Sequence, residues 1–481
     1  MMWREVVCGL GGAVFLALAG CSGESAVRPG SSAGVMTGAS SSEPSVPRVR
    51  FRLAADGLPM DGRWKSTPIV ADVNRDGAID VAAHPRLGTG PRVWLANGKG
   101  GWIDSSQGLT MERSCGGGLA FADINNDGKL DLAVADHCSG VWVYLGDGQG
   151  RWPVATEKLT PDLARAKETP GGADPTALQG AEALAVGDVN GDGFQDMVVS
   201  SSDQGGFTVY LGDGSGRNWK ERKGSGLPNG ETPEPGDIYF GGFAFDMKLV
   251  DVNRDGRLDL VASYITGPRV WWGDGGGRFE DHSQGLIKTT YGGIYARIAT
   301  ADVDNDGRLD LVVGNAINGV EVYLQNADGS WRGPIDPMPE LKGGAQAVAL
   351  CDLDGDGNVD VIIGGGMTGT AGQGQDPWGL FVRFGDGKGG WASRPGTNLP
   401  AVGMEVVWGI ACADVNGDGR PDVVVSSGGV MGKSSVPGVG PTGQAGRVVV
   451  REEVDSKRLG AAPQWPVYPH VQVWINDGGS R

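Results

Sequence analysis

The sequence has few of the residues on which hydrolases and metalloenzymes most often depend. Only four of its 481 residues are histidines, His84, His137, His282 and His470. No nucleophile elbow, phosphate-binding loop or zinc-binding histidine pair accompanies them. The six cysteines show no spacing typical of a zinc site. The sequence therefore gives no positive signal for catalysis.

Long helical periodicities with capping residues are also scarce, and aromatic residues make up only 7% of the chain. Glycine, in contrast, is very abundant at 86 residues. This composition favours many short strands joined by tight turns. We therefore expect an all-β fold, and a single barrel or propeller can use a chain of this length.

Basic residues are outnumbered by acidic ones, and the formal net charge is −17. A surface of this sign argues against nucleic-acid binding. Much of the acidity falls in one short pattern, Asp-x-Asp/Asn-x-Asp-Gly-x-x-Asp, which first occurs in ADVNRDGAID at residues 71–80. We call the nine residues of this pattern, 72–80 in the first copy, the acidic loop and number its positions one to nine.

The acidic loop occurs seven times, which makes repetition the main organising feature of the chain. The later copies are ADINNDGKLD at 122, GDVNGDGFQD at 187, VDVNRDGRLD at 250, ADVDNDGRLD at 301, CDLDGDGNVD at 351 and ADVNGDGRPD at 413. Their first aspartates are 50 to 65 residues apart. This spacing is typical of propeller blades with insertions in some loops.

Each copy lies between two short apolar strands, so the loop is predicted to be the turn of a β-hairpin. A third strand leads to a second turn, as in VWVYLGDGQGRW, and a fourth begins at an aromatic residue. The aromatic positions are Trp102, Trp152, Trp219, Phe279, Trp331 and Trp391. Four antiparallel strands in each of seven units predict a seven-bladed β-propeller.

The two ends of the repeat region complement each other. The chain stops at VWINDGGSR, before the outer strand of the seventh unit, whereas RFRLAADGLP at 50–59 aligns with RFEDHSQGLI at 278–287. We therefore expect the N-terminal strand to complete the last blade and close the ring.

These repeats resemble the FG-GAP and VCBS families, known from the calcium-bearing propeller of integrin alpha chains and from bacterial surface proteins. The resemblance covers residues 49–481, although YLGDG turns mostly replace the Phe-Gly and Gly-Ala-Pro landmarks. It implies an integrin-alpha-like propeller. Cell adhesion does not carry over, since no integrin leg or inserted ligand-binding domain is visible.

The acidic loops are predicted to bind calcium, up to seven ions with a mainly structural role. Ca²⁺ prefers six to eight oxygen ligands, and alternating side chains in a tight loop can direct carboxylates at one centre. Positions one, three, five and nine would supply side chains, and position seven its carbonyl. The predicted ligands are Asp72, Asn74, Asp76, Ala78, Asp80; Asp123, Asn125, Asp127, Lys129, Asp131; Asp188, Asn190, Asp192, Phe194, Asp196; Asp251, Asn253, Asp255, Arg257, Asp259; Asp302, Asp304, Asp306, Arg308, Asp310; Asp352, Asp354, Asp356, Asn358, Asp360; Asp414, Asn416, Asp418, Arg420 and Asp422.

The N-terminus is predicted to be a targeting signal. An apolar run at residues 6–19 is too short to span a bilayer, and it leads into LAGC, which resembles the lipobox of bacterial lipoproteins. This resemblance implies a signal peptide at 1–20, lipidation of Cys21, a flexible tether at 21–48 and the propeller at 49–481. The protein would be an exported lipoprotein at the outer membrane or cell surface, contacting membrane only through its anchor. An ordinary secretory signal is the alternative.

Four cysteines lie in the propeller, and an exported compartment permits disulfides. Cys115 and Cys138 are predicted to pair across the open end of a hairpin. Cys351 and Cys412 fall at buried-looking positions in consecutive repeats. The sequence leaves two alternatives for them, a pair of free thiols or a disulfide.

A ligand would bind on the rim opposite the acidic loops, where the repeats differ most in length. Aromatic and polar residues that could converge there are Trp64, Arg86, His137, Tyr239, Tyr264, Tyr295, Arg297, Trp378 and Trp408. Such residues suit a sugar or a peptide, although they could instead serve packing. The sequence predicts a surface-anchored module that binds an extracellular protein or glycan, with a lectin or polysaccharide lyase as the alternative.

Overall fold

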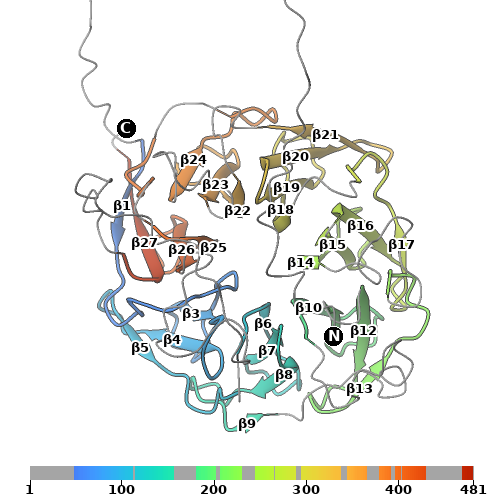
Figure 1. Ribbon diagram of the computed structural model, residues 1–481, viewed down its shortest axis with the longest axis horizontal. Coiled ribbons are helices and arrows are strands. Elements are labelled where there is room, and N and C mark those ends of the chain that lie inside the picture. The colour runs from blue at the N-terminus through green and yellow to red at the C-terminus, as the bar shows by residue number, and fades with distance from the viewer. Residues whose placement is uncertain are drawn as a thin grey trace, which may run out of the picture. The chain divides into compact units, whose positions relative to one another are not determined.

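The computed structural model describes residues 48–111, 114–155, 180–201, 206–229, 244–264, 266–288, 294–336, 344–365, 379–391, 396–401, 404–428 and 468–479. In these ranges the chain forms β-strands and no helix, so no helix there could cross a membrane. The strands form seven antiparallel sheets that follow one another around a ring (Figure 1). The prediction of a seven-bladed β-propeller is confirmed.

The sheets are named blades one to seven in the order of their acidic loops. Blades one to three contain β2 (Ile69–Ala71), β3 (Asp80–Ala83), β4 (Arg92–Ala96) and β5 (Trp102–Asp104); β6 (Leu119–Ala122), β7 (Asp131–Asp136), β8 (Gly140–Leu145) and β9 (Val154–Ala155); and β10 (Ala183–Gly187), β11 (Asp196–Ser200), β12 (Phe207–Gly212) and β13 (Trp219–Glu221). Blades four and five contain β14 (Ala244–Val250), β15 (Asp259–Tyr264), β16 (Gly267–Gly273) and β17 (Phe279–Asp281); and β18 (Tyr295–Ala301), β19 (Asp310–Asn315), β20 (Gly319–Gln325) and β21 (Trp331–Ile335). Blade six contains β22 (Ala345–Cys351), β23 (Asp360–Gly365) and β24 (Leu380–Arg383), and blade seven contains β25 (Val407–Ala413), β26 (Asp422–Ser427), β27 (Val471–Gly478) and β1 (Arg50–Leu53).

Blade six has three strands among the residues that the structure describes. Its predicted fourth strand begins at Trp391, which forms an isolated bridge with Gly385, and residues 392–395 lie outside the described ranges. The other six sheets have four strands each, as predicted.

The first strand of each blade lies at the centre of the ring. These strands contact one another in chain order from β2 to β25, and β25 contacts β2. Each second strand is buried along its whole length, whereas the outer strands β5, β17 and β21 expose all residues after their first. The side chains form seven apolar clusters, each shared by two neighbouring blades. Every blade is therefore stabilised by both of its neighbours.

The N-terminal strand closes the ring, as expected from the sequence. β1 pairs antiparallel with β27, with Phe51 opposite Asn476 and Leu53 opposite Trp474 (Figure 1). The side chain of Phe51 is buried in the cluster between blades six and seven. Its backbone amide donates to Asn398 Oδ1 at 2.7 Å, and Asn398 Nδ2 donates back to the Phe51 carbonyl at 2.8 Å.

Two disulfides lie within the propeller. Cys115 and Cys138 are bonded in blade two, with their Cα atoms 5.4 Å apart, which confirms the predicted pair. Cys351 and Cys412 are also bonded, with Cα atoms 6.4 Å apart. The second bond joins β22 to β25, so it cross-links the innermost strands of blades six and seven. Of the two alternatives left open by the sequence, the structure has the disulfide.

Replacing Phe51 by alanine should weaken ring closure. We expect Phe51→Ala to lower the free energy of unfolding by about 3 kcal/mol, because it leaves a cavity between blades six and seven. Leu53→Ala on the same strand is the matched control, since Leu53 is 39% exposed, and it should cost about 0.5 kcal/mol. Urea unfolding measures both values, and equal losses would contradict this account of closure.

Candidate functional site

The seven acidic loops share one backbone conformation. Each joins the first two strands of a blade, and the residue before position one pairs with position nine, as Ala71 does with Asp80. Position four has φ between 55° and 75° and position six between 80° and 88°. Position four is a non-glycine residue in four loops, Arg75, Asn126, Arg254 and Asn305, and no other described non-glycine residue has positive φ. Because such a residue costs roughly 1–2 kcal/mol, the loop must impose this curl.

The carboxylate at position one organises the curl. In loop one, Asp72 Oδ1 accepts a hydrogen bond from the Asp76 amide at 3.1 Å, and its Oδ2 accepts one from the Gly77 amide at 2.9 Å. The bond from the glycine amide recurs in all seven loops at 2.7–2.9 Å. The carboxylate at position five accepts a hydrogen bond from the backbone amide of position seven in every loop. The residues at position seven are Ala78, Lys129, Phe194, Arg257, Arg308, Asn358 and Arg420.

Loops five and six gather the most carboxylates. In each, positions one, three and five are all aspartates, and one oxygen from each lies within 4.8 Å of the others. The side chain of Asp304 is only 10% exposed, and its buried Oδ1 has no hydrogen-bond partner. Burying a carboxylate oxygen without a donor or a cation is costly. Such an all-oxygen site fits a hard cation such as Ca²⁺.

The aspartate at position nine has a structural role that the sequence did not reveal. All seven are fully buried. Asp80 Oδ2 accepts the amide of Val73 and its Oδ1 accepts that of Ala96, both at 2.9 Å. The same two bonds recur for the other six, Asp131, Asp196, Asp259, Asp310, Asp360 and Asp422. This carboxylate therefore clamps the acidic loop to the end of the third strand.

Burial opposes the charge on this clamp. It raises the pKa of Asp80, Asp131, Asp196, Asp310 and Asp422 to about 6 and that of Asp360 to about 7, although the backbone amides lower each value in part. The pKa of Asp259 is raised for the same reason.

The rim candidates fall into three groups. The side chains of Trp64, Tyr264, Tyr295 and Trp408 are buried, at 7%, 0%, 1% and 4% exposure. Trp64 and Tyr264, for example, pack in the clusters between neighbouring blades. Tyr239 and Trp378 lie outside the described residues. His137 and Arg297 belong to the polar contacts described next, and Arg86 is half-buried near Lys65, whose pKa burial lowers most and the charge of Arg86 lowers further.

A chain of polar contacts joins blades across the ring. From blade five, Arg297 Nη2 donates to the Lys65 carbonyl, at the start of blade one, at 2.7 Å. The Lys65 ammonium pairs with Glu182 Oε1 at the start of blade three, and Glu182 Oε2 lies 2.9 Å from His137 Nδ1 of blade two. Arg297 and Glu182 are only 7% and 3% exposed. We call Lys65, His137, Glu182 and Arg297 the axial cluster.

Electrostatics in the axial cluster favour an ionised Glu182. Burial alone would raise its pKa, but the charge of Lys65 and the hydrogen bond and charge of His137 outweigh burial and hold the pKa well below its usual range. Burial lowers the pKa of Lys65, although Glu182 opposes this shift. Lys65 and Glu182 were missed in the sequence because they do not recur. The available signal was a charge at a position that is uncharged in the other six repeats, as Lys65 aligns with Gly116 and Ala181.

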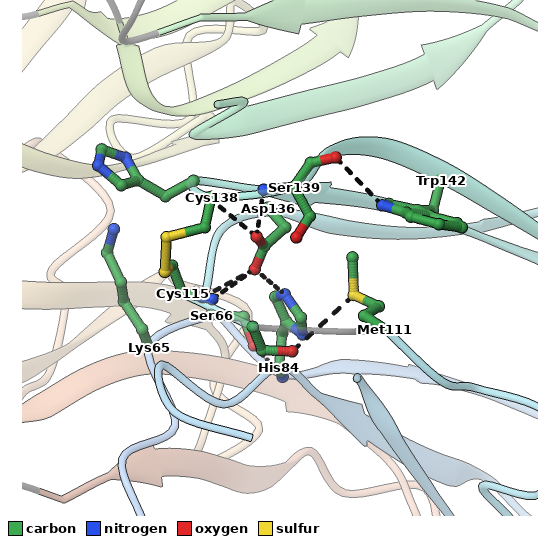
Figure 2. A network of polar contacts seen from close by, with 12 residues as sticks. Lys65, Ser66, His84, Met111, Cys115, Asp136, Cys138, Ser139 and Trp142 are labelled. Atoms are coloured by element: carbon green, nitrogen blue, oxygen red, sulfur yellow. Dashed lines mark hydrogen bonds and ion pairs between the residues drawn. A yellow bond between two sulfur atoms is a disulfide. The ribbon is translucent and has the colours of Figure 1, made fainter. Parts of the chain in front are cut away.

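A second buried carboxylate supports the axial cluster. Figure 2 shows Asp136, fully buried, with Oδ2 accepting the Cys115 amide at 2.6 Å and 2.9 Å from His84 Nε2. Its Oδ1 accepts the amides of Cys138 and Ser139 at 2.9 and 2.7 Å. Burial opposes its ionisation, but His84 and the amides lower its pKa overall. Together with the Cys115–Cys138 bond, Asp136 fixes the chain on both sides of His137.

A seven-bladed propeller with acidic hairpin turns defines the class, and the model of the FG-GAP-like repeat matches residues 72–134, 123–199, 251–313 and 302–363. The model of the FG-GAP repeat matches residues 406–450. The chain belongs to the FG-GAP-like repeat family. No curated protein matches it.

Among solved structures, the chain is similar to the BP39L lectin from Burkholderia pseudomallei, at 18% identity and a TM-score of 0.47, covering 79% of this chain and 93% of the lectin. It is similar to an Agrocybe aegerita lectin that recognises non-reducing terminal N-acetylglucosamine, at 19% identity and a TM-score of 0.42, covering 68% and 79%. It is also similar to the rhamnogalacturonan lyase PL11 of Bacillus licheniformis, at 12% identity and a TM-score of 0.42, covering 78% and 74%.

Removing the charge of the clamp should destabilise the protein even without a cation. We expect Asp131→Asn to lower the free energy of unfolding in chelator by about 2 kcal/mol, because one amide of the clamp would meet an NH₂ group. Asp127→Asn in the same loop is the control, since Asp127 is exposed, and should change it by at most about 0.5 kcal/mol. Chemical denaturation in chelator measures both, and a silent Asp131→Asn would rule the clamp out.

Neutralising Glu182 should destabilise the protein, because the buried ammonium of Lys65 would lose its negatively charged partner. We expect Glu182→Gln to lose about 3 kcal/mol of stability at pH 7, and the Lys65→Met/Glu182→Leu double variant to recover most of it. The lowered pKa of Glu182 stabilises the folded state above its ordinary value near 4.5, and this contribution disappears as the pH falls. The acid limb of the stability profile should therefore be flatter for Glu182→Gln than for the wild type. If stability falls equally steeply with decreasing pH in both proteins, Glu182 does not stabilise the folded state through a lowered pKa.

Proposed function

We propose that this protein is a calcium-stabilised propeller that serves as an extracellular binding module, attached to the cell surface through a lipid on Cys21. The observation that carries the proposal is the sevenfold acidic loop, in which one backbone directs the oxygens of positions one, three and five into the same turn. In loop five, the buried Asp304 Oδ1 has no donor, which supports a cation at this point. The side chains of these positions, with the carbonyl of position seven, would hold the ion. Position nine was also predicted as a ligand, but both of its oxygens already accept backbone amides, as those of Asp80 do.

Charge supports the same conclusion. Several carboxylates within a few ångströms repel one another unless a cation or a proton intervenes. Seven Ca²⁺ ions would add 14 positive charges and change the formal net charge from −17 to −3. We therefore infer that the cations are structural and that they hold the hairpin of each blade.

The binding role rests on the regularity of the scaffold. Cations at one end of every blade would leave the connections at the other end free to vary in length, as they do in the sequence. Variable loops on a rigid support are the usual position of binding residues. The partner would be an extracellular protein or a glycan, and we infer no role in nucleic-acid binding.

A carbohydrate-active protein, either a lectin or a polysaccharide lyase, is a second candidate. The half-buried Arg86 favours it, because burial and the charge of Arg86 lower the pKa of the nearby Arg63, although the charge of Glu405 opposes this shift. Two guanidinium groups close together suit an acidic sugar. A glycan array combined with polysaccharide turnover separates the candidates. A lectin retains glycans unchanged, a lyase produces unsaturated sugar ends, and a protein-binding module does neither.

Calcium should raise the melting temperature of the purified propeller. Each site that binds only the folded state adds about 2.7 kcal/mol of stability when free calcium is 100 times its Kd. Calorimetry in millimolar calcium and in chelator measures the shift, and magnesium is the control, because it prefers a rigid octahedral site and should stabilise less. A melting temperature that chelator leaves unchanged would overturn the calcium proposal.

A further inference from the structure

Loops five and six are each contacted by an arginine from outside the loop. In loop five, Arg332 Nη2 lies 3.0 Å from Asp304 Oδ2. In loop six, Arg48 Nε pairs with Asp354 Oδ2, and Arg48 Nη2 lies 3.0 Å from Asp356 Oδ2. Arg332 belongs to β21 of the same blade, whereas Arg48 comes from the opposite end of the chain.

These two loops are also the ones with an extra negative charge. Position three is aspartate in loops five and six and asparagine in the other five loops. The outside arginine cancels that extra charge. Asp354 is only 6% exposed at its side chain and Arg48 is 49% exposed, so the pair is partly shielded from solvent. A buried carboxylate gains more from such a partner than a fully exposed one.

Arg48 directly precedes the strand that closes the ring. Val49, the next residue, is fully buried, and its amide donates to the Gly396 carbonyl of the blade six region at 2.9 Å. The guanidinium of Arg48 also lies 4.7 Å from the centre of the Phe384 ring. Three contacts therefore attach the start of β1 to blade six before β1 pairs with β27 in blade seven.

The partner of the closing strand contacts the same loop. Asn476 on β27 donates from Nδ2 to the carbonyl of Leu353, position two of loop six, at 2.8 Å. Both strands of the closing pair are thus attached to loop six, one through Arg48 and the other through Asn476. Among the described residues of loop five, the corresponding arginine contact comes from its own blade.

We propose that Arg48 is an internal counter-charge for loop six, which keeps the closing strand docked when the loop holds no cation and so links cation binding to ring closure. The attraction of Arg48 for the loop is strongest while the carboxylates are unneutralised, and a bound cation weakens it. Because coupling between two sites is reciprocal, Arg48 in turn lowers the affinity of loop six for the cation. This inference rests on the proposed function, since it takes the cation to be calcium.

The test compares Arg48→Gln with Arg332→Gln as the matched control in the full propeller. Hydrogen exchange of residues 50–53 and 471–478 is measured in chelator and in calcium, and calcium binding is measured by titration calorimetry. In chelator, Arg48→Gln should exchange the closing strands about fivefold faster than the wild type, the low end of typical couplings. Calcium should reduce this difference, because a bound cation weakens the attraction of the wild-type Arg48 for the loop. Arg332→Gln should leave these strands unchanged. Both variants should bind calcium more tightly than the wild type does.

The outcomes separate the two proposals. If the closing strands exchange equally fast in Arg48→Gln and Arg332→Gln in chelator, and calorimetry still detects calcium binding, the role of Arg48 is wrong and the proposed function stands. Calcium binding by none of the proteins would overturn the proposed function and the coupling with it. Arg48→Lys retains the charge on a folded chain and should protect the strands nearly as well as the wild type. Exchange as fast as in Arg48→Gln would show that charge is not the cause.

Discussion

A carboxylate with no access to solvent, at position nine of the acidic loop, holds each blade together. Its two oxygens accept backbone amides from the loop and from the end of the third strand, as Asp80 does with Val73 and Ala96. A buried charge needs such partners, and here the partners lie in two different segments of the blade. The clamp therefore fixes the curl of the loop and the register of three strands at once.

This constraint explains how the curled turns remain ordered next to several negative charges. Amides of the loop donate to the carboxylates of positions one and five, so these oxygens are held in the turn by the backbone itself. The cation that we propose would therefore meet a site that the clamp has already shaped, which would lower the ordering cost of binding. Because each apolar cluster is shared by two blades, order in one turn also supports the packing of its neighbours.

The sequence predicted what repeats and missed what does not. Seven copies of one loop gave the number of blades, the closing strand and the Cys115–Cys138 disulfide. Lys65, Glu182 and Asp136 were missed because each makes its main contact with a residue of another repeat or of a unique turn, which no periodicity reveals. Two of the four buried aromatics, Tyr295 and Trp408, were hard to place for a different reason. Strands β14, β18, β22 and β25 carry register shifts near their starts, as between Tyr295 and Arg297. Two residues that a regular strand would place on one face therefore separate, with Tyr295 in the interblade core and Arg297 at the axial cluster.

The residues that do not recur concentrate where the ring closes, because a repeated blade cannot supply a contact that occurs only once. A closed ring needs one junction between chain ends, and repetition cannot supply it because the junction occurs once. There the structure has β1 beside β27, the Cys351–Cys412 bond between blades six and seven, and the contact of Arg48 with loop six. The axial cluster likewise occurs once and joins blades that are not neighbours, as Arg297 and Lys65 do. Since any blade could bear the same cation, differences between blades must determine how binding in one loop affects the whole ring. The search for specificity therefore belongs to these single-copy residues rather than to the repeated loop.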